Sequence, residues 1–406
     1  MQRKAKCILG ICIVAGILTI SGCWDKREIN ELGLVTSVGI DKAAKRNQYM
    51  VTVEIANPSV SNATAETSGS GQSGGGSVWI ASATGDSIFD ATRNLVNISS
   101  RRIMWAHNSV IIIGAPLARE GIAPVVDYFT HQPELRLKAA VVVAKGDAKD
   151  YIPTKIGMDT PNGTSFILMQ AYRSLAAESA NSHMLEVATS LASKHGNPLI
   201  AEIRLKNAIR QPNAGNSSGA KNPQTVEMAG AAVFKKDRMI GWLTPTETRG
   251  SSWILNQTKN TVVTVTDPAH HYKNVSVETS DVKAMIKTTV KNGMPRISIR
   301  ITGNGTIAEE DGKTSLGINQ MKKHVAVLVD RKIESEVRHT LSVVQNKYGV
   351  DVLGFAAIVH VQNDREWESG LMDQWETIFP MIPVQVSADI HIKSSRLNQE
   401  PMRIPR

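Results

Sequence analysis

The sequence contains few cysteines. Among 406 residues there are three, and two of them, Cys7 and Cys12, lie in an apolar segment near the N-terminus. If that segment is removed, Cys23 is the only cysteine that remains, and no intramolecular disulfide can form. The rest of the chain must then be stabilised by packing.

A hydrophobic run long enough to cross a membrane is also missing. Residues 7–20 form a mostly apolar run of 14 residues after three basic residues, whereas a transmembrane helix needs roughly 20. This layout is typical of a secretory signal peptide. We therefore expect residues 1–22 to direct export and to be removed by cleavage between Gly22 and Cys23.

The end of this segment reads Ile20, Ser21, Gly22, Cys23, which resembles a bacterial lipobox. The resemblance implies that Cys23 carries an S-diacylglycerol thioether, with N-acylation a further option, because only a thiolate is nucleophilic enough to form that bond. Two plainer alternatives remain at this stage. One is a signal peptide that happens to end at a cysteine, and the other is an uncleaved anchor.

The charge pattern argues against a nucleic-acid partner. The chain has a net charge of +9 and only 5% aromatic residues. Its basic residues are scattered, without the arginine-rich runs and interleaved aromatics typical of nucleic-acid binding. A mild positive excess suits a position beside anionic lipid headgroups.

Catalytic, metal and cofactor motifs occur only out of context. Ser73 lies in a G-x-S-x-G match within the Ser/Gly-rich residues 59–77, and Ser280 with Lys283 forms an S-x-x-K match where we expect a strand. Residues 303–308 imitate a dinucleotide fingerprint but precede an acidic turn instead of a helix. His107 has no second ligand at metal spacing, so we interpret it as structural. The sequence predicts no catalytic, metal or cofactor site.

The hydrophobic periodicity predicts a multi-domain α+β or mixed α/β protein with mixed and antiparallel sheets packed against helices. We expect an N-terminal α/β domain over 23–207, with a break near 153–163, and a Pro/Gly-rich linker over 208–225. A C-terminal α+β domain over 226–395 should hold an antiparallel meander. One long helix over 319–348 should span about 45 Å.

Four blocks in order resemble the Ger(x)C spore germination lipoproteins, the C subunits of germinant receptors in endospore-forming bacteria. The first is Cys23, Trp24, Asp25 with Glu28 and Ile29, followed by Gly-Ile-Asp at 39–41. The others are residues 105–121, residues 230–250, and residues 351–355 with a following tryptophan and the last strand. Members often have a glycine soon after that strand, where this chain has residues 393–396 without one.

This resemblance implies a non-enzymatic subunit anchored by lipid on the extracytoplasmic side of the spore inner membrane. It would act with the polytopic A and B subunits in receptor assembly and nutrient-triggered germination. Trp24, Asp25 and Glu28, next to the bilayer, would dock on these partners.

Two other classes of lipoprotein fit the sequence less well. A solute-binding lipoprotein of an envelope transporter would have two similar βαβ lobes, and an anchored envelope hydrolase would need a catalytic constellation.

Overall fold

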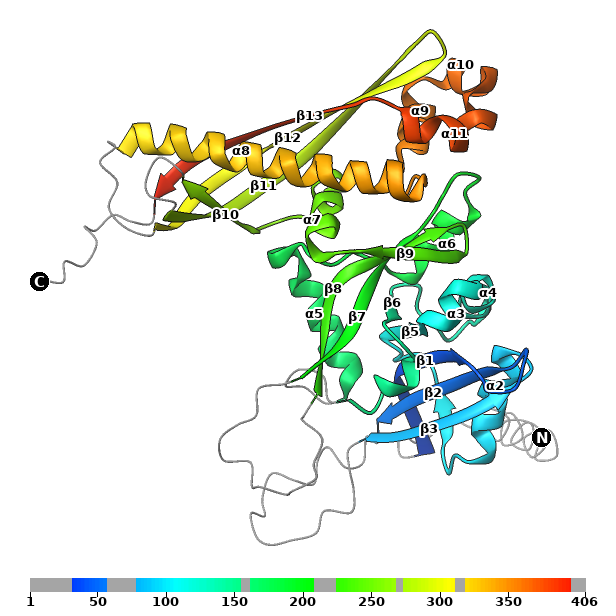
Figure 1. The fold of residues 1–406 in the computed structure, drawn as a ribbon. Coiled ribbons are helices and arrows are strands. Elements are labelled where there is room, and N and C mark those ends of the chain that lie inside the picture. The colour runs from blue at the N-terminus through cyan, green and yellow to red at the C-terminus, as the bar shows by residue number, and fades with distance from the viewer. Residues whose placement is uncertain are drawn as a thin grey trace, which may run out of the picture.

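The computed structural model describes residues 31–56, 78–154, 161–207, 224–267, 273–310 and 318–395. They form two β-sheets, each packed with helices, arranged as two bodies in contact (Figure 1). The first sheet is mixed, and the second combines antiparallel pairs with one parallel pair. The predicted α+β class, with mixed sheets packed by helices, is confirmed.

The first sheet has the order β3-β2-β1-β5-β6-β7-β8-β9, with β4 paired to β1. Its central strands run parallel, and β5 and β6 are buried throughout, as their β-branched sequences predict. The strand patterns at residues 48–56 and 78–83 predict an antiparallel hairpin, which the pairing of β2 with β3 confirms. The strands are β1 (Leu32–Lys42), β2 (Tyr49–Ala56), β3 (Val78–Gly85), β4 (Arg102–Met104), β5 (Val110–Gly114), β6 (Ala140–Ala144), β7 (Leu199–Asn207), β8 (Gln224–Lys235) and β9 (Arg238–Leu243).

The helices of the first body are short. Ser87 caps the first of them by accepting a hydrogen bond from the backbone N–H of Asp90 at 3.0 Å. The sequence of residues 117–129 predicts a single helix, and this prediction is wrong: Gly121, at φ 147°, ends one helix before Ala123 begins the next. These elements are α2 (Ile88–Asn94), η2 (Leu95–Asn97), α3 (Ala115–Glu120), α4 (Ala123–His131), η3 (Ala148–Asp150), α5 (Asn162–Ala176) and α6 (Met184–Ala192).

The second sheet has the order β10-β11-β12-β13, with β10 (Val262–Asp267), β11 (Lys273–Lys291), β12 (Met294–Glu310) and β13 (Val384–Ser395). The alternating pattern of the sequence predicts separate strands at 275–279 and 283–290, but one strand continues through a bulge where Asp281 takes φ 53°. The last strand pairs parallel with β12, so the sheet is not a purely antiparallel meander.

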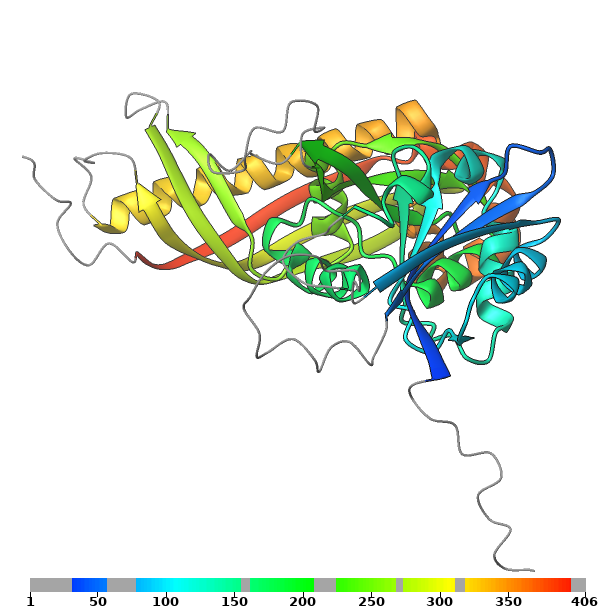
Figure 2. The same ribbon diagram turned by 90° about the horizontal axis from the view of Figure 1, so that it is seen from below.

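A long helix lies along one face of this sheet, as Figures 1 and 2 show. It comprises α8 (Ile318–Ser342) and a π-helical end, η5 (Val343–Tyr348), which confirms the prediction for residues 319–348. Its apolar stripe is buried: Val325, Val329, Ile333, Val337, Leu341 and Val344. The remaining helical elements are α7 (Pro245–Ile254), α9 (Phe355–Gln362), α10 (Asp364–Glu366), η6 (Trp367–Leu371), α11 (Met372–Ile378) and η7 (Phe379–Met381).

Strand β8 joins the two bodies. Ala232 and Phe234 belong to the core of the first body, while Ala231 and Val233 belong to the core that contains α8, because successive strand residues face opposite sides. Most of the predicted linker lies outside the described residues, and β8 after it pairs with β7. The first sheet thus extends beyond this segment, and the domain boundary at 208–225 stays a prediction.

Candidate functional site

The residues predicted to carry the anchor and the docking contacts lie outside the described residues. These are Gly22, Cys23, Trp24, Asp25 and Glu28, and Ser73 of the G-x-S-x-G match is also outside. Their roles stay predictions. Within the described part of the chain, no helix is long and apolar enough to span a membrane.

The remaining residues that match catalytic, metal or cofactor motifs lie in positions that do not fit the chemistry of those motifs. His107 is exposed in the turn between β4 and β5. Ser280 and Lys283 lie on either side of the β11 bulge rather than one helical turn apart. Gly305 is packed inside the sheet, where a Cβ would come within 2.7 Å of Ile392, so this stretch cannot cradle a phosphate.

Several residues of the family blocks instead make buried hydrogen bonds or close packing contacts that connect separate elements of the fold. We call these contacts structural joints. Asp41, of the Gly-Ile-Asp block, is 2% exposed and accepts hydrogen bonds from the backbone N–H groups of Ala148 and Lys149 at 2.7 and 2.8 Å. Burial raises the pKa of Asp41 to about 6, against the opposing effect of these two bonds. This carboxylate ties β1 to the turn after β6.

A second joint connects α7 to α8. The buried carboxylate of Glu336 on α8 pairs with the Arg249 guanidinium and accepts a hydrogen bond from the Trp253 indole N–H at 3.1 Å. The helices approach closely at Gly250, where a Cβ would lie 2.6 Å from the backbone oxygen of Glu336. The glycine of this block is therefore required by packing.

A third joint centres on Asp351, which is 4% exposed. Its carboxylate accepts hydrogen bonds from the backbone N–H groups of Leu353, Phe355 and Ala356 and from the Trp375 indole N–H. Burial raises the pKa of Asp351. The sequence favours a helix flanked by Trp367 and Trp375, but Trp375 lies inside α11. Its N–H donates to the Asp351 carboxylate, which also accepts from the first N–H groups of α9.

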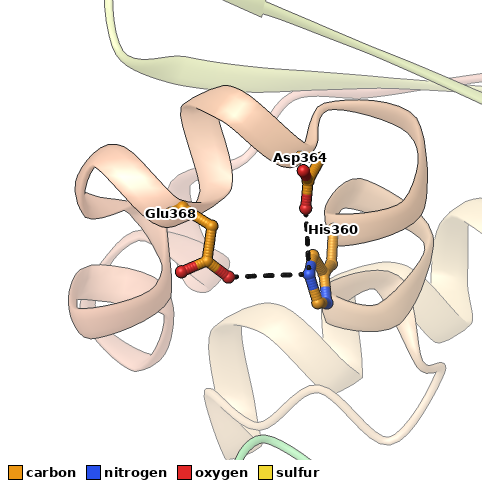
Figure 3. Close-up of side chains that lie close together, drawn as sticks. All are labelled: His360, Asp364 and Glu368. Carbon is orange, nitrogen blue, oxygen red and sulfur yellow. Dashed lines mark ion pairs between the residues drawn. The ribbon is translucent and has the colours of Figure 1, made fainter.

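One surface cluster has the composition of a metal site. His360, Asp364 and Glu368 point toward one another (Figure 3), with the imidazole Nε2 3.3 Å from the Asp364 carboxylate and 3.7 Å from that of Glu368. All three are exposed, and the His360 ring stacks on Trp367. Ion pairing accounts for this arrangement without a metal. No other group of three such ligands comes together in the part of the chain that the structure describes.

A polar cleft of about 470 Å³ lies beside α5, and we call it the α5 cleft. It is formed by five separate segments: the residue before β5, the start of β6, helix α5, the residues before α6, and the loop after α7. The residues that line it are Ser109, Lys138, Ala140, Ile167, Gln170, Ala171, Arg173, Ser174, Asn181, His183, Asn256, Gln257 and Lys259.

The sequence interpretation missed this cleft. The mixture of apolar and polar residues at helical spacing in 166–175 favours core packing over a binding site. The three cations Lys138, Arg173 and Lys259 lie too far apart in the chain to form a recognisable motif. The only local signal was the presence of Gln170 and Arg173 among apolar neighbours on one helix.

Comparison with known proteins gives matches along most of the chain. Residues 25–205 match the family model of the spore germination protein N-terminal domain, and residues 229–396 match the spore germination B3/GerAC-like C-terminal model. Among relatives from Bacillus subtilis (strain 168), the chain is 24% identical to spore germination protein KC over 98% of both chains. It is 23% identical to spore germination protein B3 over 89% of this chain and 91% of that one.

The fold is similar to that of a solved structure, the crystal structure of the GerBC protein. The TM-score is 0.55 at 18% identity, over 87% of this chain and 96% of that one. The four sequence blocks, the two family models in order and this fold agree. The chain belongs to the Ger(x)C family of spore germination proteins.

Proposed function

We propose that the chain is the lipid-anchored C subunit of a spore germinant receptor, which acts with the polytopic A and B subunits in the spore inner membrane. The observation that carries this proposal is the match of both family models, in order, to residues 25–205 and 229–396. Relatives similar over nearly their whole length are named spore germination proteins.

The subunit would work through surfaces rather than by catalysis. Three titratable residues of the family blocks are occupied in structural joints: Asp41 with the turn after β6, Arg249 with Glu336 of α8, and Asp351 with Trp375. The solute-binding alternative is less well supported, because the second body has a sheet crossed by α8 instead of a second βαβ lobe.

The anchor would hold the folded part close to the bilayer. Strand β1 begins at Leu32, so only residues 24–31 separate it from Cys23. Acyl chains contribute about 0.8 kcal/mol per buried CH₂, and two or more chains give stable anchoring. Trp24, Asp25 and Glu28 lie in this short segment and would meet the membrane partners there.

The anchor is tested by Cys23→Ala in cells grown with radioactive palmitate. We expect the variant to lose the label, to leave the membrane fraction or remain unprocessed, and to support germination poorly. Cys12→Ala, within the predicted signal peptide, is the matched control and should retain the label. A Cys23→Ala protein that is labelled normally would contradict the anchor.

Docking is tested separately by Asp25→Lys and Glu28→Lys, with Glu366→Lys on an exposed helix as the control charge reversal. We expect the first two to reduce germination and co-purification with the A and B subunits. The melting temperature should hardly change, since surface substitutions cost less than ~0.5 kcal/mol. Normal co-purification of both variants would refute the docking role.

A further inference from the structure

We propose that the α5 cleft binds a small organic acid through its carboxylate. This site is independent of the receptor role above, because it depends on side chains of the purified chain and not on the A and B subunits. The assignment comes from the charge of the lining, from buried polar atoms without partners, and from the size of the cleft.

The lining is positively charged. Lys138, Arg173 and Lys259 line the cleft from three different segments, together with His183, and none of its described lining residues is acidic. A nearby carboxylate, Glu186, is engaged by the backbone N–H of His183 at 2.9 Å and by its ring at 3.3 Å. A cleft lined by charges of one sign concentrates ligands of the opposite sign.

Two side chains of α5 have buried polar atoms without a partner in the described structure. Gln170 is 8% exposed, and neither its amide nitrogen nor its amide oxygen has a hydrogen-bond partner. In Arg173 the Nε and Nη1 atoms are buried and also lack partners. Burial lowers the pKa of the Arg173 guanidinium, and Glu186 only partly opposes this.

These groups match a carboxylate. A guanidinium offers N–H groups in a planar fork that can bind both oxygens of a carboxylate, and such charge-assisted hydrogen bonds are stronger than neutral ones. The Gln170 amide nitrogen can donate a further bond. Buried donors left unpaired cost free energy, so a ligand that accepts from them gains affinity by removing that cost.

The size and walls of the cleft indicate a small organic ligand. A volume of about 470 Å³ lies within the range of small-molecule sites. Ala140, Ile167 and Ala171 provide apolar contact for a few carbon atoms beside the cationic groups. Helix α5 packs on one face of the first sheet, where Phe166 shares a core with residues of β5 and β6. The loop after α7 supplies Asn256, Gln257 and Lys259, so both bodies contribute to the site.

The full chain in detergent can be titrated calorimetrically with succinate at constant ionic strength, with succinamide as the neutral analogue and inorganic phosphate as the competing anion. We expect saturable binding of succinate, weaker binding at higher salt, and no binding of succinamide. Equal binding of phosphate and succinate would overturn the assignment to a carboxylate, and so would the absence of saturable succinate binding.

Arg173→Gln should weaken succinate binding by about tenfold or more, since it removes charge-assisted hydrogen bonds. Arg136→Gln, an exposed arginine outside the cleft, is the matched control and should bind as the parent does. If Arg173→Gln does not fold, Lys259→Gln on the exposed rim should still weaken binding about threefold by loss of one cation. Parent-like affinity in a folded Arg173→Gln protein, or in Lys259→Gln, would refute the site.

Discussion

Replacing Asp351 by asparagine tests whether the family blocks act as structural joints. One carboxylate oxygen accepts from the backbone N–H groups of Leu353 at 3.2 Å and Phe355 at 3.1 Å. The other accepts from Ala356 N–H at 2.7 Å and from the Trp375 indole at 3.2 Å. Asparagine has nearly the same shape but places an NH₂ group against one of these pairs of donors.

The expected loss of stability in Asp351→Asn can be estimated from the backbone and indole donors that lose their acceptor. Each buried donor left unsatisfied costs about 1–3 kcal/mol, and two are affected, while removal of a buried negative charge offsets part of the loss. The raised pKa of Asp351 shows that burial disfavours its charged form, so replacing the charge by a neutral amide recovers part of the lost stability. We expect Asp351→Asn to lower the free energy of unfolding by about 2–4 kcal/mol.

The assay is urea unfolding followed by tryptophan fluorescence, since Trp367 and Trp375 are both buried next to this joint and lie 5.3 Å apart between ring centroids. Asp364→Asn, in the exposed cluster with His360, is the control and should change stability by less than ~0.5 kcal/mol. A loss in Asp351→Asn no larger than that of the control would refute the reasoning.

Two other joints give further predictions. Because the pKa of Asp41 is about 6 in the folded protein and about 3.9 in the unfolded chain, the folded state keeps a proton that the unfolded state has lost. The contribution of Asp41 to the free energy of unfolding should therefore fall as pH rises from about 4 to 6. Asp41→Asn should remove this contribution, so the free energy of unfolding of the variant, measured in urea melts, should fall less or rise more over this range than that of the parent; the same slope in both proteins would contradict the assignment. Gly250→Ala should cost about 1–3 kcal/mol by overpacking, because its Cβ would lie 2.0 Å from the Thr340 hydroxyl. Parent-like thermal stability would show that α7 and α8 can move apart.

Several elements could be predicted from the sequence because they depend on neighbours along the chain. The stripe from Val325 to Val344 was enough to predict α8, since spacing near 3.6 residues requires one buried helical face. The β-branched strands β5 and β6 and the alternating strand β2 follow in the same way from short-range pattern. The family was also recognisable, because its blocks are local motifs in a fixed order.

Other features were decided only by the tertiary structure. Local patterning does not say which strands pair, so the parallel contact of β13 with β12 and the addition of β8 to the first sheet could not be anticipated. The α5 cleft has the same origin: Lys138, Arg173 and Lys259 meet only because the β5–β6 edge, α5 and the loop after α7 converge. Asp41 and Asp351 could be recognised in the sequence as residues of the family blocks. Their structural role follows only from the fold, which buries each carboxylate against backbone N–H groups.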